Sequence, residues 1–240
     1  MSRQVIWRPA LASAFSVSIA SLGCAGRATV ECIPRGTPAV ARSMPADTGA
    51  RVWRFDGPAD ASPAGFDLGH TGGPAGVWRI RSRADAPSVP AVLVQEDSSR
   101  ESSRFLTAVA SGMLWRDGSV SVQCAALSGG IDRACGVVWR FQDEHNYYVA
   151  RANALENNVR LYYVQDGSRH EIAGWNGPVA SCVWHSLRAD MRGDQIDVFW
   201  NGQHVIGARD SRFAQAGRVG LWVKADSRTA FDDLTMRILP

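Results

Sequence analysis

The sequence predicts an all-β sandwich of two antiparallel sheets. From about residue 51 to residue 240, short runs of alternating apolar and polar residues follow one another with a period of two. Gly, Asn and Asp turn signals separate the runs, and no stretch of about eleven residues shows a helical period. Many short strands with closely spaced turns are typical of a sandwich or a barrel. About 190 residues is an ordinary size for one such domain.

Individual runs show this pattern in detail. The run at residues 119–124 alternates strictly, and other runs are rich in the aromatic and β-branched residues that favour strands. Asp166-Gly167 and Asn201-Gly202 each separate two runs, which predicts tight hairpin turns at both places. The expected strands cover residues 119–124, 137–141, 147–150, 159–164, 196–200, 203–206, 219–223 and 231–238.

The N-terminus has the pattern of an export signal. Arg3 and Arg8 form a positive n-region, and the uncharged, mostly small or apolar residues 10–23 fit an h-region. That stretch is shorter than the ~20 apolar residues that a membrane-spanning helix needs. The expected division of the chain is a signal peptide at residues 1–25, a flexible linker at 26–50 and a sandwich at 51–240.

Two fates after export stay open. Gly23 and Ala25 form a small-x-small site for signal peptidase. Residues 21–24 also resemble a lipoprotein box that ends in Cys24, although its leucine lies one position later than usual. The protein is therefore expected to be periplasmic, anchored to the outer membrane by a lipid on Cys24, or extracellular. That anchor is the only membrane contact expected.

Export permits disulfides among the five cysteines. Without Cys24 four remain, and four cysteines allow three pairings. Cys124 and Cys135 flank residues 128–130, a glycine-containing segment that predicts a hairpin loop, and each lies on the apolar phase of its strand. A disulfide between Cys124 and Cys135 and a pair of buried free thiols both remain open. No Cys-x-x-Cys pair supports a zinc or thioredoxin-type site.

Composition narrows the range of partners. The chain is 45% hydrophobic and 20% charged, which is ordinary for a globular protein. Its net charge of +3 is small, and acidic residues intervene between the short arginine clusters. A nucleic-acid partner would need a basic patch or stripe, so none is expected. The protein is expected to be a monomer.

Several longer stretches resemble a known family. They comprise residues 63–66, 72–78, 136–143, 146–158, 219–226 and 231–234. These stretches are similar to the 3-keto-disaccharide hydrolase-type domains of secreted bacterial proteins, also called family 16 glycosidase-like, within the concanavalin A-like (laminin G-like) superfamily. The resemblance covers residues 51–240 and implies a jelly roll of two antiparallel sheets, with ligands on the concave sheet.

The catalytic residues of these relatives are not matched. Retaining family 16 glycosidases carry Glu-x-Asp-x-Glu, because the reaction needs two carboxyl groups about 5 Å apart, and no such run occurs in this sequence. The 3-keto-disaccharide hydrolases carry Asn-Ser-Gly-Ile-x-x-Arg and a Glu-x-Gln pair. Residues 135–140 match only the Gly-apolar-x-x-Arg part, and the Glu-x-Gln pair is missing. No catalytic residue is predicted.

No cofactor or metal site is predicted either. The five histidines are scattered without the spacing of metal ligands. Asp143, His145 and Asn146 leave a structural calcium ion open, because their oxygen atoms are of the kind that calcium prefers. A loop cap before the next strand is the alternative explanation for the same residues.

Strand parity predicts a polar recognition face. Lys224, the only lysine among 26 basic residues, lies on a run whose alternation places Trp222 and Asp226 on its own face and Leu221 and Val223 on the other. Because the apolar pair must face the core, Trp222 is expected to be exposed. The expected ligand-binding residues are Arg140, Arg151, Asn153, Glu156, Trp222, Lys224 and Asp226. Guanidinium, amide and carboxylate groups beside an exposed indole suit a sugar.

Simpler explanations and several functions stay open. Lys224 and Asp226 can form a surface ion pair, and Arg151 and Glu156 can pair across a turn. The favoured function is that of a secreted or envelope-anchored sandwich that binds a glycan without catalysis. The first alternative is a hydrolase of a modified glycoside such as a 3-keto-glycoside, with Glu156 and Asp226 as its candidate carboxylates. The second is a structural envelope module that binds a protein partner.

Overall fold

The computed structural model describes Cys32 and residues 49–239. The predicted signal peptide, the lipidation candidate Cys24 and nearly all of the predicted linker lie outside these residues. The described part contains no helix, and so none that could cross a membrane. Its fifteen strands are β1 (Ala50–Trp53), β2 (Phe66–Thr71), β3 (Trp78–Ser82), β4 (Ala91–Gln95), β5 (Phe105–Ala110), β6 (Gly118–Ser128), β7 (Ala134–Asp143), β8 (Asn146–Asn153), β9 (Asn158–Gln165), β10 (Ser168–Asn176), β11 (His185–Arg192), β12 (Gln195–Trp200), β13 (Gln203–Arg209), β14 (Arg218–Lys224) and β15 (Arg228–Arg237).

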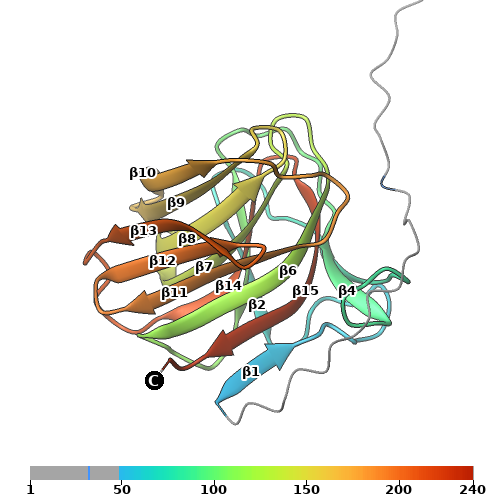
Figure 1. The fold of residues 1–240 in the computed structure, drawn as a ribbon. Helices are drawn as coiled ribbons and strands as arrows, with labels where there is room; N and C mark the ends of the chain where they lie inside the picture. Colours follow the sequence, from blue (N-terminus) through green and yellow to red (C-terminus); the bar gives the residue numbers. More distant parts are fainter. Residues whose placement is uncertain (1–31, 33–48, 240) are drawn as a thin grey trace, which may run out of the picture.

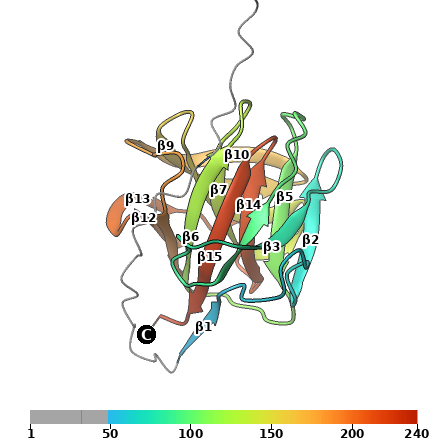
Figure 2. The same cartoon turned by 90° about the vertical axis from the view of Figure 1, so that its right-hand side faces the viewer.

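The strands form two sheets that lie face to face (Figures 1 and 2). The eight-stranded sheet has the order β13-β12-β11-β6-β15-β4-β3, with β1 also paired to β15. The seven-stranded sheet has the order β10-β9-β8-β7-β14-β5-β2. Every pairing is antiparallel. The predicted all-β sandwich of two antiparallel sheets is confirmed.

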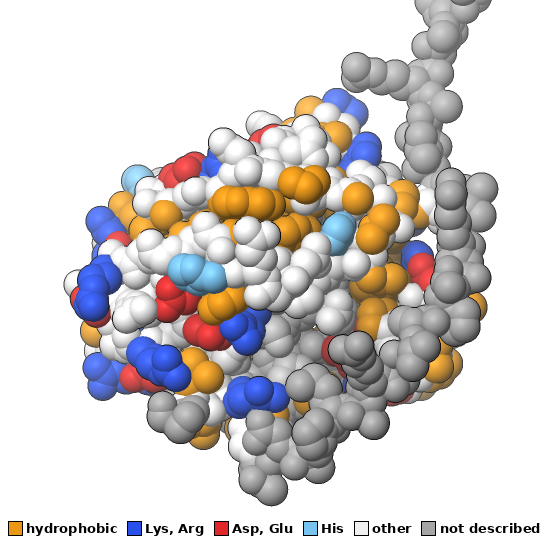
Figure 3. All heavy atoms as spheres, viewed as in Figure 1, with side chains coloured by type: hydrophobic (Ala, Val, Ile, Leu, Met, Phe, Trp, Pro, Cys, Tyr) orange, Lys and Arg blue, Asp and Glu red, His pale blue; other side chains and the backbone are white. Residues whose placement is uncertain are grey.

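The main core lies between the two sheets. Trp139, Leu161 and Leu221 contribute to it from the seven-stranded sheet, and Val122 and Leu187 contribute from the eight-stranded sheet. All are inward positions of strands that alternate in sequence, as expected for packed sheets. On the face seen in Figure 3, basic and acidic side chains are intermingled rather than separated by sign.

The two predicted hairpin turns have the backbone that such turns require. Asp166 and Gly167 join β9 to β10 with φ angles of 52° and 77°, and Asn201 and Gly202 join β12 to β13 with φ angles of 49° and 82°. A type I′ turn needs a positive φ at both central residues, which asparagine, aspartate and glycine tolerate best. The local turn chemistry therefore identified both hairpins.

The predicted hairpin between Cys124 and Cys135 is wrong. Cys124 lies on β6 in the eight-stranded sheet, whereas Cys135 lies on β7 in the seven-stranded sheet. The glycine-containing segment between them crosses from one sheet to the other, because its residues indicate a change of direction but not the sheet that follows. The structure joins the two cysteines by a disulfide across the core, and a second disulfide joins Cys32 to Cys182.

A buried carboxyl group on β15 anchors the β3–β4 connection. Asp232 is 0% exposed, and its two oxygens accept hydrogen bonds from the backbone N–H of Ser88 (2.7 Å) and from the Ser88 hydroxyl (2.9 Å). Burial raises the pKa of Asp232 to about 7, the hydrogen bonds from Ser88 oppose the rise, and the nearby Asp233 adds to it. The unfolded chain, with an ordinary aspartate pKa, loses this proton at a lower pH than the folded protein.

This raised pKa predicts a loss of stability as the pH rises. The folded state binds the proton of Asp232 more tightly than the unfolded state does. Burial of this group therefore destabilises the fold little below pH ~4, where Asp232 is neutral, and most above pH ~7, where it is ionised. Between pH 5 and 8 the wild type should lose up to about 2–3 kcal/mol that Asp232→Asn does not lose. Urea unfolding of both proteins at pH 5 and 8 checks this. Equal changes in the two proteins would contradict it.

Candidate functional site

Trp222 faces the side of the sheet that its parity predicts. Leu221 and Val223 belong to the main core, whereas Trp222 belongs to a second apolar cluster on the outer face of the seven-stranded sheet. The expected exposure of the indole is nevertheless wrong, because Trp222 is 0% exposed. Its ring packs against Phe105 of β5, with ring centroids 5.4 Å apart. Trp222 is therefore a packing residue.

The turn of the β7–β8 hairpin lies against β2 on the outer face of the sheet. The hydroxyl of Thr71 on β2 donates a hydrogen bond to the backbone oxygen of Glu144 in that turn, although β14 and β5 lie between β7 and β2. A Cβ atom on Gly69 of β2 would lie only 3.0 Å from Cγ of Glu144. Tyr147, just after the turn, accepts a hydrogen bond of 3.3 Å from Nε1 of Trp222. The turn therefore reaches across the outer face.

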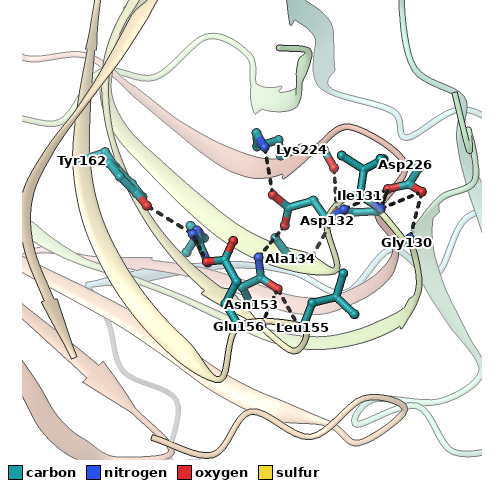
Figure 4. Close-up of polar contacts among 12 residues, drawn as sticks. Gly130, Ile131, Asp132, Ala134, Asn153, Leu155, Glu156, Tyr162, Lys224 and Asp226 are labelled. Carbon is teal, nitrogen blue, oxygen red and sulfur yellow. Dashed lines mark hydrogen bonds and ion pairs between the residues drawn. The ribbon is translucent and has the colours of Figure 1, made fainter. Parts of the chain in front are cut away.

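Polar side chains gather at one end of this outer face (Figure 4). They come from the β6–β7 segment, from β8 and the turn after it, from the start of β9 and from the end of β14. These residues, which we call the polar cluster, are Asp132, Arg151, Asn153, Glu156, Asn158 and Lys224.

One half of the polar cluster is centred on a buried carboxylate. Asp132 is 2% exposed, and its Oδ2 atom lies 3.2 Å from Nζ of Lys224. Its Oδ1 atom accepts a hydrogen bond of 2.7 Å from the side-chain amide of Asn153. Burial raises the pKa of Asp132, while the charges of Arg151 and Lys224 oppose the rise. Both carboxylate oxygens are thus engaged by the protein.

The other half is centred on a buried guanidinium. Arg151 donates hydrogen bonds to Asn158 (2.7 Å), to Glu156 (2.8 Å) and to the hydroxyl of Tyr162 (3.2 Å). Burial by itself would raise the pKa of Glu156, but the hydrogen bond and charge of Arg151 hold that pKa below its usual value. The Glu156 side chain is 48% exposed. It is the charged group through which the cluster reaches solvent most openly.

The structure brings together four of the seven predicted site residues, namely Arg151, Asn153, Glu156 and Lys224. A fifth, Asp226, lies next to them, but its carboxylate is bound to backbone N–H groups. Its carboxylate accepts hydrogen bonds of 2.8 to 3.1 Å from the N–H groups of residues 130–132. Asp226 thereby holds the segment that carries Asp132.

Sequence reasoning missed Asp132. The sequence predicts a hairpin loop for its segment, whereas its position beside Lys224 depends on the crossing between the two sheets. The run Gly129-Gly130 indicates a change in chain direction, but no local sequence pattern indicates where Asp132 lies in the fold. The Asp226 carboxylate determines that position through the backbone of the crossing segment.

Arg140 does not join the polar cluster, contrary to the prediction from strand parity. A bulge between Trp139 and Asp143 interrupts β7, and Arg140 lies in it with a φ of 44°. Its buried guanidinium donates hydrogen bonds elsewhere in the fold. The acceptors are the backbone oxygens of Arg116, Phe213 and Gly193 and the carboxylate of Asp117. Parity along a strand does not extend through a bulge.

Among Cys32 and residues 49–239, no group of three or more His, Cys, Asp or Glu side chains is placed to hold a metal ion. At the segment considered for calcium, Asp143 accepts hydrogen bonds from the backbone of His145 (2.7 Å) and from the side chain of Asn146 (3.0 Å). These contacts are those of a loop cap, the alternative explanation.

The fold is shared with proteins that bind or process carbohydrates. A carbohydrate binding module, CBM66 from Bacillus subtilis, superposes with a TM-score of 0.56 at 18% identity, over 70% of this chain and 94% of the module. The Bacillus licheniformis beta-glucanase superposes with a TM-score of 0.51 at 11% identity, over 80% of this chain and 99% of the enzyme. The fold is a concanavalin A-like jelly roll. At these identities the likeness shows the fold alone.

Sequence comparison gives one partial relative among curated proteins. Levanase from Bacillus subtilis (strain 168) is 28% identical over 94 residues, which is 39% of this chain and 14% of levanase. The chain therefore matches only a small part of that enzyme. No family model matches the sequence.

Proposed function

We propose that this protein binds a saccharide, without catalysis, through the polar cluster on the outer face of the seven-stranded sheet. The observation that carries the proposal is a network of fixed guanidinium, ammonium, amide and carboxylate groups that reaches solvent at Glu156 and, to a smaller extent, at Lys224. Such groups can match sugar hydroxyls without first losing side-chain freedom. Ile131 and Leu155, which are 38% and 41% exposed, lie beside the cluster and offer apolar contact (Figure 4).

The arrangement favours binding over hydrolysis. Retaining hydrolysis needs one carboxyl group as an acid and a second as an unobstructed nucleophile. In this cluster Asp132 is engaged by Lys224 and Asn153, and Glu156 is engaged by Arg151. The carbohydrate binding module with the same fold supports the proposal. The partial match to levanase makes levan, a fructan, a suitable first probe.

The proposal includes export. The N-terminal pattern of Arg3, Arg8 and the apolar residues 10–23 supports secretion, followed either by release or by a lipid anchor on Cys24. A saccharide-binding face would then meet glycans outside the cytoplasm, and both disulfides would form in an oxidising compartment.

Removing the charge of Glu156 should weaken binding. We expect Glu156→Gln to lower the affinity about tenfold, or ~1.4 kcal/mol, because a carboxylate accepts stronger hydrogen bonds from sugar hydroxyls than an amide does. The glutamine oxygen can still accept from Arg151, so the fold should persist. Affinity electrophoresis of the full chain on levan, laminarin, dextran and polygalacturonate, followed by calorimetry on the best ligand, measures the effect.

A matched control removes a similar ion pair from the other sheet. Glu96 accepts two hydrogen bonds of 2.6 Å from Arg81 of β3, so Glu96→Gln changes an equivalent pair far from the cluster in sheet order. We expect this variant to bind as the wild type does. No binding to any of the four polysaccharides, or equal affinities for wild type and Glu156→Gln, would refute the proposed function.

A further inference from the structure

Arg169 on β10 has an unusual environment for a cation. Its guanidinium carbon lies 4.3 Å from the ring centroid of Tyr162, 5.3 Å from that of Phe105 and 5.7 Å from that of Trp222. Among the described residues its side chain has no ion-pair partner, and its Nη1 atom is buried without a hydrogen-bond acceptor. An arginine carries five N–H donors, so this group lacks the acceptors that it normally takes.

No carboxylate of the polar cluster forms an ion pair with Arg169, although the charges of Asp132 and Glu156 act on it from a longer distance. Arg151 lies 5.7 Å from the same Tyr162 ring and is paired with Glu156. Lys224 is paired with Asp132. The polar cluster and Arg169 together therefore contain three cations and two carboxylates, and each of these carboxylates is already paired with another cation. Burial lowers the pKa of Arg169 and the charge of Arg151 acts in the same direction, while Tyr162, Asp132 and Glu156 oppose the shift.

The aromatic rings hold the guanidinium ready for an anion. Stacking on Tyr162, Phe105 and Trp222 restricts the side chain before a ligand arrives, which reduces the entropy lost on binding. A guanidinium also matches the planar geometry of a carboxylate, with two parallel N–H donors. A neutral sugar hydroxyl would satisfy one donor but leave the excess positive charge.

We propose that the saccharide bound at this face is anionic, and that Arg169 binds its carboxylate or sulfate group while the polar cluster binds its hydroxyls. This inference rests on the proposed function and adds the chemical class of the ligand. Glu156, held in place by Arg151, would then contact hydroxyl groups of the sugar unit whose acidic group lies on Arg169.

Paired ligands that differ only in charge test the inference. Calorimetry with the full chain compares trigalacturonate with its methyl ester, and dextran sulfate with dextran. We expect the wild type to bind at least one charged ligand ten or more times tighter than its neutral counterpart, and the preference to shrink as NaCl rises from 50 to 300 mM. The two pairs distinguish a carboxylate from a sulfate.

Two variants and a control assign the preference to Arg169. Arg169→Gln should abolish the preference for the charged ligand, and Arg169→Lys should restore part of it, because lysine keeps the charge but not the paired donors. Arg51→Gln removes an exposed arginine from β1, in the other sheet, and should change nothing. Circular dichroism confirms that each variant is folded.

The outcomes separate this inference from the proposed function. Equal binding of charged and neutral ligands by the wild type would overturn the anionic ligand but leave saccharide binding in place. A charge preference that survives in Arg169→Gln, or that Arg51→Gln reduces equally, would show attraction by net charge and would also overturn it. Absence of binding to every saccharide would overturn both proposals.

Discussion

Replacing Trp222 with alanine is expected to lower the free energy of unfolding by about 3–5 kcal/mol. The indole is fully buried, packs on Phe105 and donates a hydrogen bond to Tyr147. Its removal leaves a cavity on the outer face and takes one hydrogen-bond partner from the Tyr147 hydroxyl. Chemical denaturation followed by circular dichroism measures the loss.

A smaller change at the same position separates the two contributions. Trp222→Phe keeps most of the ring but not the indole N–H, so we expect a loss of about 1–2 kcal/mol. If Trp222 were instead an exposed platform for a sugar, both variants would keep their stability and lose affinity. A loss below about 1 kcal/mol in Trp222→Ala would therefore contradict a packing role for the indole.

Replacing Lys224 with methionine is expected to cost about 3–5 kcal/mol at pH 8, because it leaves the Asp132 carboxylate buried without its cation. Asp132 is 2% exposed and lies 3.2 Å from the Lys224 ammonium. Without Lys224 the pKa of Asp132 should rise further. Because that pKa is raised in the folded state, the deficit should be smaller at pH 4 than at pH 8.

A second substitution should rescue this variant. Asp132→Asn removes the buried charge, and the asparagine oxygen can still accept the hydrogen bond from Asn153. The double variant Asp132→Asn/Lys224→Met should therefore be more stable at pH 8 than Lys224→Met alone. Urea titrations of the wild type, the two single variants and the double variant form the complete cycle. A double variant no more stable than Lys224→Met would show that the unpaired charge of Asp132 is not the cause of the lost stability.

Strand parity predicted which way side chains point, but not what covers them. Alternation along the run that ends at Lys224 correctly assigned Leu221 to the core and Trp222 to the opposite face. The cover over Trp222 comes partly from Arg169 of β10, a strand far away in the sheet order, whose guanidinium carbon lies 5.7 Å from the indole ring centroid. Such a contact depends on the curvature of the whole sheet, and no local pattern contains it.

The wrong prediction for Arg140 and the failure to predict Asp132 have a similar cause. Arg140 lies in a bulge, and a bulge disrupts the period of two on which strand parity depends. Asp132 lies on a crossing between sheets, and local turn signals do not distinguish a crossing from a hairpin. By contrast, Arg151 and Asn153 lie on an uninterrupted part of β8, where parity holds and both meet Glu156 or its backbone.

Mapping the bound saccharide onto the protein tests binding at the polar cluster most directly. Amide chemical shifts of the full ¹⁵N-labelled chain locate the contact when they are recorded during addition of the tightest-binding saccharide from the electrophoresis and calorimetry experiments. Binding at the polar cluster predicts the largest changes at residues 130–132, 151–158 and 224. Changes confined to the open hollow lined by Gln195, Asp197, Gly207, Ala208 and Arg209 on the other sheet, with none at the cluster, would contradict it.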